Sequence, residues 1–376
     1  MEKRKLALIG IIIVLIIAVI ALIGTAFTGF SIKQKDSTVS IAWIGPLTGE
    51  SATTGRENLN GISVAVDRIN SQGGINGKKV VLTIQDDKYD PKETINAYNK
   101  LVNENKVKFL LIDTYGGYLA LNEQAKKDNV IIIDSIDATK ELSNKGNNSF
   151  AIGIYDESIG QSIADYINKN DSKKVGIITN NQAEFTLLVQ GAFKEKYKGN
   201  LDEESYNFGL TDFRSILTKL SDEDFIVLNG FDETGRAVKQ AHELGINSTI
   251  IGIDTFATDN FKRNTGNSYE GLIFTFWQGS SNNPKFNEFI LDYKNKYGKE
   301  PDNILFASVG NDAIGALMDS ISKCNNEDVN CIKFRLMNLK NYQGSSGNIT
   351  MDSDGITRSI KETMFTYKNG KAISLD

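Results

Sequence analysis

Residues 41–49 read Ile-Ala-Trp-Ile-Gly-Pro-Leu-Thr-Gly, and they open the stretch of sequence, residues 41–91, that decides the fold. The apolar run Val39–Ile44 stops at Gly45-Pro46, which is typical of a strand followed by a loop. After that loop, apolar side chains recur at spacings of three and four residues, which predicts one buried stripe of a helix. The stripe consists of Leu59, Ile62, Val66 and Ile69.

The rest of this stretch predicts a second strand and a second helix. Gly73-Gly74 ends the first helix, and Val80–Ile84 is another apolar run of strand length. Asp90 then precedes Pro91, a pair typical of a helix N-cap followed by the first helical position. A strand, a helix and a strand in this order form a βαβ unit, which opens a parallel sheet.

Beyond residue 91 the chain keeps alternating strand-length apolar runs with helical patterns. This alternation predicts an α/β fold of mostly parallel sheets with helices on both faces. The strands are too many for one small sheet, so we expect two lobes. The predicted strands lie at Val107–Asp113, Val130–Asp134, Val175–Thr179, Phe225–Asn229, Thr249–Ile253 and Leu272–Phe276, and the predicted helices near 91–104, 118–128, 157–169, 184–197, 213–220, 232–244, 284–297, 304–323 and 329–339.

The composition gives no sign of nucleic-acid binding or of catalysis. The chain has 42 lysines and arginines against 47 aspartates and glutamates, so no basic field points to nucleic acid. The single histidine, His242, lies on a predicted helix flank, and no Gly-x-Ser-x-Gly elbow is present. Asp352-Ser-Asp-Gly355 starts like a calcium loop, but Lys361 occupies the place of the required glutamate. We therefore expect no enzyme activity, no metal site and no cofactor.

The N-terminus predicts a membrane anchor or a signal. Residues 1–5 are basic and form a cytoplasmic stub, whereas Leu6–Gly24 carries no charge. At about 1.5 Å per residue this segment can cross a hydrocarbon core of roughly 30 Å. The alternative is a cleavable signal peptide, for which Gly24-Thr25-Ala26 offers a cleavage site. We favour the uncleaved anchor, with residues 25–37 as a stalk and the remainder outside the cytoplasm.

The sequence motifs of residues 41–91 closely resemble those of one protein family. The segment ending Gly-Pro-Leu-Thr-Gly49, the turn Gly73-Gly-Ile-Asn-Gly77 and the segment Asp86-Asp-Lys-Tyr-Asp-Pro91 occur in this order. They resemble the start of type I extracytoplasmic (periplasmic) solute-binding proteins of the branched-chain amino-acid (Leu/Ile/Val) group of ABC transporters. The resemblance implies two lobes with three crossings between them. By analogy the crossings fall near Ile154, Trp277 and Tyr342, so that lobe 1 is 38–154 plus 278–342 and lobe 2 is 155–277 plus 343–376.

Loops at the carboxyl ends of the predicted strands are the candidate binding site, because ligands of parallel α/β sheets lie there. The loop 49–55 offers Thr54, and Tyr115-Gly116-Gly117 exposes backbone amides that suit a carboxylate, unless the glycines only form a turn. The third such loop contains Ile136 and the fourth contains Asp254.

The resemblance assigns roles to several positions. Gly117 stands where the family has a ligand-binding serine, and Ala138 stands at a threonine position, with Thr139 beside it. Asp254 matches the acid that accepts the ligand ammonium; its alternative role is a helix N-cap. The remaining positions implied by the resemblance are Asp156, the aromatic residues Phe185 and Phe231, and Trp277 as an apolar wall.

The two cysteines suit an oxidising compartment. Cys324 and Cys331 are seven residues apart at a predicted helix–helix connection, so we expect a small-loop disulfide; two unpaired thiols are the alternative.

The expected function is that of a membrane-tethered solute-binding protein that closes about a hinge. The resemblance implies an ABC permease and an ATPase as partners. An amino acid is the favoured ligand, and a peptide, an amide or a polyamine-like compound stays open. The alternative function is a ligand-sensing ectodomain that works with a separate membrane partner.

Overall fold

The computed structural model describes residues 38–49, 51–143, 148–169, 174–266, 268–277, 279–324 and 327–375. The predicted cytoplasmic stub, membrane segment and stalk (1–37) lie outside the described residues. Within them, the one helix long and apolar enough to cross a membrane is Ile304–Ser322. It is buried in the protein core, so we interpret it as a core helix of the folded domain.

The first lobe is built on a fully parallel sheet. Its strand order is β2-β1-β3-β4-β6. Successive side chains of β1 point to opposite faces, so Ile41 and Trp43 enter one core while Ala42 and Ile44 enter the other. The strands are β1 (Thr38–Gly45), β2 (Lys79–Asp86), β3 (Phe109–Ile112), β4 (Ile131–Asp134) and β6 (Ser149–Ala151).

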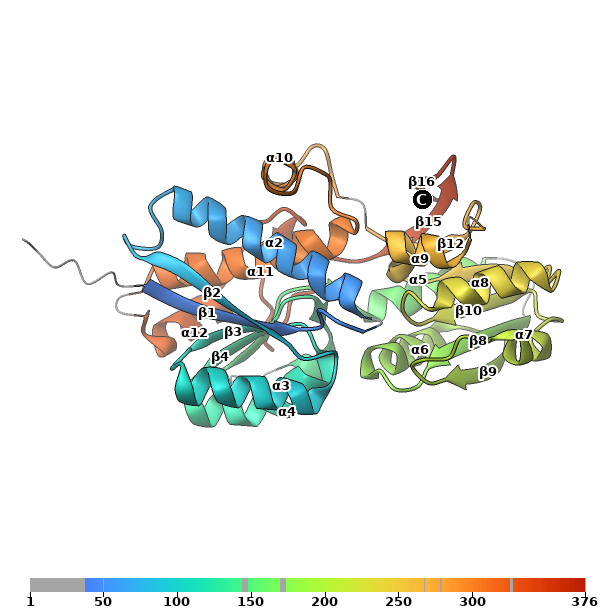
Figure 1. Ribbon diagram of the computed structural model, residues 1–376, viewed down its shortest axis with the longest axis horizontal. Coiled ribbons are helices and arrows are strands. Elements are labelled where there is room, and N and C mark those ends of the chain that lie inside the picture. Colours follow the sequence, from blue (N-terminus) through green and yellow to red (C-terminus); the bar gives the residue numbers. More distant parts are fainter. Residues whose placement is uncertain are drawn as a thin grey trace, which may run out of the picture. The chain divides into compact units, whose positions relative to one another are not determined.

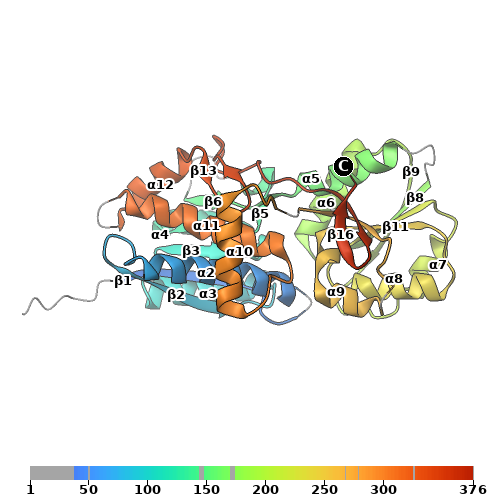
Figure 2. The ribbon, with the colours of Figure 1, turned by 90° about the horizontal axis from the view of Figure 1, so that it is seen from above.

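Helices cover both faces of this sheet (Figure 1). The face of Trp43 packs on α2 (Ala52–Ser71), α11 (Ile304–Ser322) and α12 (Val329–Met337). The other face packs on α3 (Pro91–Asn99), its π-helical continuation η1 (Lys100–Glu104) and α4 (Tyr115–Asp128). The helix α10 (Pro284–Tyr297) lies outside α2 and α11 (Figure 2), where Phe289 and Tyr293 contact Val64 and Ala307.

The second lobe has a mixed sheet of order β16-β15-β12-β11-β10-β8-β9. It is parallel from β9 to β12 and antiparallel from β12 through β15 to β16. The strands are β8 (Lys174–Asn180), β9 (Asn200–Tyr206), β10 (Phe225–Asn229), β11 (Thr249–Gly252), β12 (Ile273–Phe276), β15 (Thr363–Lys368) and β16 (Lys371–Ser374). The helices are α5 (Glu157–Asn168) and α6 (Glu184–Lys196) on one face, and α7 (Arg214–Lys219), α8 (Thr234–Glu243) and α9 (Asp259–Asn264) on the other. The predicted α/β class with two lobes is thus confirmed.

Two of the crossings between the lobes run side by side. The short strand β7 (Ile154–Tyr155) pairs in parallel with β5 (Asp137–Ala138) and, through Ile154, with Ile360. The amide of Tyr155 donates to the carbonyl of Ile360 at 2.8 Å. We call β5, β7 and residues 356–360 the hinge ribbon. The remaining crossing lies between the end of β12 and the start of α10.

The third crossing lies later than we expected from the sequence. Tyr342 begins β13 (Tyr342–Gln343), which pairs with β14 (Asn348–Ile349). Ile349 and Met351 are buried in the first-lobe core, whereas Ile360 is buried in the second. The predicted boundary at Tyr342 is therefore wrong, because two apolar anchors after it hold the chain to the first lobe until the hinge ribbon.

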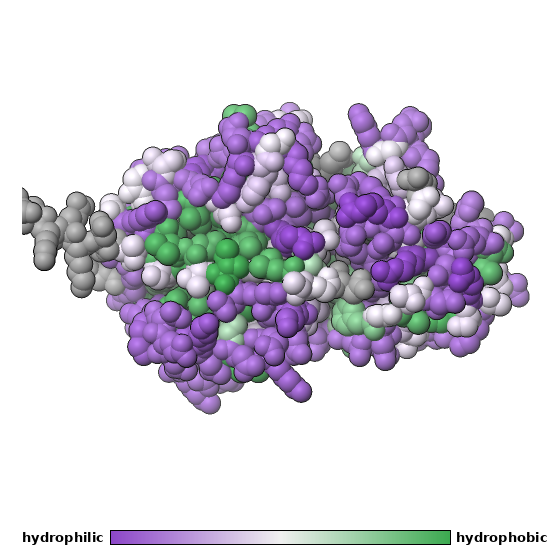
Figure 3. Space-filling model, in the orientation of Figure 1, coloured by the Kyte–Doolittle hydropathy of each residue, from purple (hydrophilic) through white to green (hydrophobic). Residues whose placement is uncertain are grey.

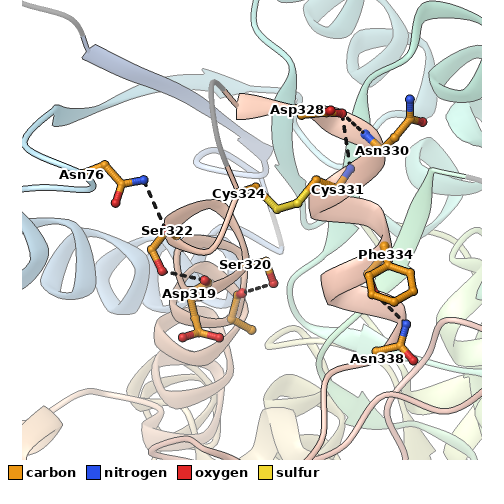
Figure 4. Close-up of a disulfide and its surroundings, with 11 residues drawn as sticks. Asn76, Asp319, Ser320, Ser322, Cys324, Asp328, Asn330, Cys331, Phe334 and Asn338 are labelled. Carbon is orange, nitrogen blue, oxygen red and sulfur yellow. Dashed lines mark hydrogen bonds between the residues drawn. A yellow bond between two sulfur atoms is a disulfide. The ribbon is translucent and has the colours of Figure 1, made fainter.

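The predicted disulfide is present. Cys324 and Cys331 are bonded, with Cα atoms 5.9 Å apart, and join the end of α11 to α12 (Figure 4). The side chain of Asp328 caps α12 by accepting from the amides of Asn330 and Cys331. Closing so short a loop is expected to stabilise the fold by roughly 2–3 kcal/mol.

One edge of the first sheet is apolar and open. Figure 3 shows exposed apolar side chains on the first lobe in the region of β2, and Val81 and Ile84 of this strand are 40% and 42% exposed. Within the part of the chain that the structure describes, β2 pairs with β1 alone. The Asn70 side chain bonds to the amide and carbonyl of Val80, and the Gln85 side chain donates to the carbonyl of Ile84, so side chains cover part of this edge.

Candidate functional site

A cavity lies where strands of both sheets end. From the first lobe it receives loop residues that follow β1, β2, β3 and β4, and from the second lobe residues that follow β10 and β11. This is the position where parallel α/β sheets bind ligands. Its free volume is about 30 Å³, room for one or two water molecules. The lining residues are Pro46, Ser51, Thr54, Tyr89, Asp113, Ile136, Asp137, Phe185, Phe231, Asp254, Thr255 and Phe306.

Aromatic rings from the two lobes meet in this cavity. The ring of Tyr89, from the first lobe, contacts Phe231, from the second, edge to face with centroids 5.5 Å apart. Phe185 and Phe208 pack against the same Phe231 ring at 6.5 and 5.6 Å. These rings occupy most of the space, so a solute larger than water needs the lobes to separate or the rings to turn.

The Asp86-Asp87 pair holds Tyr89 in place. Lys88 and Tyr89 have φ of 58° and 60°, a left-handed conformation that costs free energy in residues other than glycine. Asp86 Oδ1 accepts from the Lys88 amide and Asp87 Oδ1 from the Tyr89 amide, each at 3.0 Å. The two aspartates thus compensate for the strain of the turn that carries the tyrosine.

Asp87 is also anchored to the two helices beneath the site. Its Oδ2 accepts from the hydroxyls of Thr94 and Thr114, at 2.8 and 2.6 Å. This agrees with a structural role for the Asp-Asp pair.

The carboxylate of Asp254 is buried and incompletely paired. The residue is 2% exposed and starts the 3-10 turn η3 (Asp254–Ala257), which is separated from the end of β11 by one residue. Its Oδ1 has no hydrogen-bond partner among the described residues. Burial raises its pKa to about 7, because a desolvated charge is unfavourable.

The first lobe contributes two further acids to the cavity. Asp113, directly after β3, is 2% exposed and its Oδ2 has no partner among the described residues. Asp137 is 7% exposed and lies on the hinge ribbon. Burial raises the pKa of Asp137, and the charges of Asp134, Asp113 and Asp254 raise it further.

Two more acids lie beside these without lining the cavity. Asp134 Oδ1 accepts from the amides of Ile136 and Asp137, at 3.1 and 2.9 Å, and so fixes the loop that presents Asp137. Asp156 is completely buried at the start of α5, and neither of its carboxylate oxygens has a partner among the described residues. Burial and the charges of Asp137 and Asp134 raise its pKa.

The predicted site residues divide into two groups. One group lines the cavity, namely Thr54, Ile136, Phe185, Phe231 and Asp254. The other group lies elsewhere, namely Tyr115, Gly116, Gly117, Ala138, Thr139, Asp156 and Trp277.

Several members of the second group have structural partners. The hydroxyl of Tyr115 bonds to Thr139 Oγ1 at 3.1 Å and donates to Glu141 Oε2 at 2.8 Å, so these groups are engaged with one another. A Cβ on Gly117 would lie 2.3 Å from the Thr94 hydroxyl, which shows that this glycine permits close packing of α4 on α3.

The glycines 116 and 117 do not form the turn that we considered as an alternative. They lie inside α4, which begins at Tyr115, three residues before the predicted start. Trp277 is half-buried after β12 and packs edge to face on Phe286 at 6.0 Å, at the second crossing. Ala138 lies next to Asp137 in β5 and is buried in the first-lobe core.

Sequence reasoning missed several lining residues. Asp113 directly follows an apolar strand, and this position at a strand end could have predicted that it lines the cavity. Tyr89 and Asp137 were harder to predict as lining residues. The direction of the Tyr89 side chain depends on a left-handed turn, and the position of Asp137 depends on the pairing of β5 with β7 in the hinge ribbon. The other missed residues are Pro46, Ser51, Thr255 and Phe306.

Comparison with known proteins agrees with this architecture. The Leu/Ile/Val-binding protein BraC3 of Rhizobium johnstonii is 27% identical over 350 residues, which cover 90% of this chain and 94% of that protein. The branched-chain amino acid transporter substrate binding protein LivJ of Streptococcus pneumoniae, solved in complex with isoleucine, superposes with a TM-score of 0.81 at 29% identity, covering 90% and 98% of the two chains. The leucine binding protein LivK of Thermotoga maritima gives 0.80 at 25% identity, covering 90% and 98%.

All three relatives are named as binding proteins, and LivJ is named as the substrate binding protein of a transporter. The sequence profile of the family described as periplasmic binding protein matches residues 38–369, nearly all of the folded part. The two sheets, the cavity at their strand ends and this match together show that the chain belongs to the periplasmic binding protein family.

Proposed function

We propose that this protein captures a small solute bearing an ammonium group, closes its lobes around it and delivers it to an ABC permease powered by an ATPase. An N-terminal membrane anchor at residues 6–24 holds the binding domain at the outer face of the membrane. An amino acid or a related amine is the solute class.

One observation carries this proposal. The cavity is bordered by both lobes, and the Asp254 carboxylate lines it while buried and with one oxygen unpaired. A buried carboxylate needs a cation or several donors, and a ligand ammonium supplies both. The names of the relatives, which describe Leu/Ile/Val-binding proteins, support the same ligand group.

Contacts between the lobes support hinge closure. The ring contact of Tyr89 with Phe231 joins them across the cavity. The hinge ribbon lies alongside, so a rotation about it opens or closes the cavity without breaking either sheet. A solute that contacts both lobes binds the closed form better, and its binding therefore shifts the population toward closure.

The test is a thermal-shift screen of the full chain, purified in detergent, against amino acids, amines, amides and sugars. A ligand at about 100 times its dissociation constant adds roughly 2.7 kcal/mol, which raises Tm by a few degrees. We expect amine-containing solutes to raise Tm in the original chain and not in Asp254→Asn. Asp222→Asn, which removes an exposed charge on a turn, is the matched control. An unchanged Tm with every solute would contradict the proposed function.

A further inference from the structure

The cavity contains more acid than one ammonium group needs. Asp254 lines it from the second lobe, and Asp113 and Asp137 line it from the first. No lysine, arginine or histidine is among the lining residues that the structure describes. Because a buried, unpaired carboxylate is costly, three acids around one small cavity imply a partner that carries more than one positive charge.

The acids behind the lining add further carboxyl groups and no positive charge. Asp134 and Asp156 are also buried. Beyond the effect of burial, the charge of Asp134 raises the pKa of Asp137, and the charges of Asp137 and Asp134 raise the pKa of Asp156. Glu362, buried next to Asp254, adds a further carboxyl group on the second-lobe side. The Oδ2 of Asp113 and the Oδ1 of Asp254 remain without partners among the described residues.

A metal ion does not fit this arrangement. Among the described residues, no group of three or more His, Cys, Asp or Glu side chains is arranged to hold a metal ion. Asp254 reaches the cavity from the second lobe, whereas Asp113 and Asp137 reach it from the first. An organic molecule with charges at separate atoms suits carboxylates that come from two lobes.

The walls between the acids suit such a molecule. The rings of Tyr89, Phe185 and Phe231 line the cavity. Aromatic faces attract alkylammonium and guanidinium groups and also cover the methylene chain between them.

An acid of the second lobe lies next to Gly116, where the sequence suggested a place for a ligand carboxylate. Gly116 lies in the first turn of α4, and a Cβ on it would be 2.9 Å from both carboxylate oxygens of Glu184, which comes from α6 of the second lobe. A protein carboxylate thus lies beside the first turn of α4, and a solute carboxylate there would meet a like charge.

We propose that the solute carries two cationic nitrogens, one bound by Asp254 and the other by Asp137 with Asp113. This inference rests on the proposed solute-binding function and specifies its substrate class. The class includes small diamines and amino acids with a basic side chain, which share the two cationic groups and differ in the carboxylate.

Two matched pairs of probes test the second cationic group by calorimetric titration of the full chain in detergent. Cadaverine differs from pentylamine, and L-lysine from L-norleucine, mainly by one terminal ammonium. In at least one pair we expect the doubly cationic member to bind about 10- to 100-fold more tightly, because charge-assisted hydrogen bonds are worth that factor. Whichever pair responds tells whether the solute retains a carboxylate.

Substitutions test which residue binds the second cationic nitrogen of the solute. Asp137→Asn keeps the shape of the side chain and is expected to reduce the difference within the responding pair to a few-fold. Asp222→Asn, the exposed control, is expected to preserve it. A difference that survives in Asp137→Asn would overturn the assignment of this subsite.

The outcomes of these titrations distinguish failure of the doubly cationic solute class from failure of the proposed solute-binding function. Equal affinity within both pairs, or binding of L-isoleucine without binding of any doubly cationic probe, would overturn the dication class and leave solute binding intact. No binding of any amine or amino acid would overturn both.

Discussion

At the scale of single residues, the carboxyl groups around the cavity lie where burial favours their protonated form. Burial raises the pKa of Asp254 and that of Asp134 to about 7, from an ordinary value of 3.8. The titratable groups that face them are also acids, namely Asp113, Asp137, Asp156 and Glu362. The empty site is therefore expected to hold protons that a cationic solute displaces.

This leads to a stability that decreases as the pH rises. Between roughly pH 4 and 7 the folded chain binds more protons than the unfolded chain, so the free energy of unfolding falls with increasing pH. Each excess proton contributes up to about 1.4 kcal/mol per pH unit. Urea unfolding of the ligand-free protein at about pH 5 and about pH 7.5 measures the difference.

Two variants check that the cavity acids cause this dependence. Asp137→Asn removes one titrating group and its repulsion, so we expect the pH dependence to become shallower and the stability at the higher pH to increase. The exposed control Asp222→Asn is expected to leave the pH dependence of stability unchanged. Equal or greater stability of the original chain at the higher pH would contradict the prediction.

The sequence predicted part of the site at this scale. Asp254 could be placed because it follows directly on an apolar strand, and strand ends of a parallel sheet share one edge. Tyr89 could not, since its direction depends on two consecutive left-handed residues held by hydrogen bonds from Asp86 and Asp87. Gly116 and Gly117 suggested a loop, but close packing of α4 accounts for Gly117.

At the scale of elements, the hinge ribbon depends on a glycine. Gly153 immediately precedes β7, and a Cβ there would lie 2.2 Å from the carbonyl oxygen of Ile136 and 2.7 Å from the amide of Asp137. No side chain fits between these strands without moving the backbone. The close approach also keeps the Asp137 loop in register with the crossing.

We therefore expect Gly153→Ala to destabilise the protein by about 1–3 kcal/mol, the usual cost of forced overpacking. Gly191→Ala is the control, because it adds the same methyl group at an exposed helical position with nothing within 4 Å. That variant is expected to be neutral or up to about 1 kcal/mol more stable. Urea unfolding measures both, and equal stabilities would show that the ribbon tolerates a side chain.

Most helices and the apolar strands, the edge strand β2 included, were predictable from periodicity, whereas polar or very short strands were not. Central β10 reads as a continuous apolar run and was found with its exact bounds. Edge strand β9 reads Asn-Leu-Asp-Glu-Glu-Ser-Tyr and is largely exposed, so no apolar alternation marks it. The strands β5, β7, β13 and β14 are two residues long and exist only through tertiary pairing.

At the scale of the whole binding domain, the second crossing contains a natural reporter of hinge motion. The chain has two tryptophans, and Trp43 is completely buried in the first lobe. Trp277 is half-buried after β12 and packs on Phe286 of α10, so it connects the second sheet to a helix of the first lobe.

Solute binding is therefore expected to change the fluorescence of Trp277 and its quenching by acrylamide. Trp277→Phe removes the signal, while the solute still raises Tm. A saturating solute that raises Tm but leaves Trp277 fluorescence unchanged would argue against hinge closure.

The position of the third crossing between the lobes could not be predicted from the sequence. The resemblance placed it near Tyr342, where the composition changes little. Its true position depends on Ile349 and Met351 packing against a core whose other members come from the opposite end of the domain. Such long-range packing is not visible in any local window of the sequence.

The interleaving of distant chain segments in each lobe determines when that lobe can be completed during synthesis. The core around Val39 and Trp43 also needs Leu317 and Met351, and the second sheet needs β15 and β16, which begin only at Thr363. Because a polypeptide is synthesised from its N-terminus, neither lobe can be completed until the last quarter of the chain has been made. The order of the segments therefore makes the completion of both lobes depend on the C-terminal end of the chain.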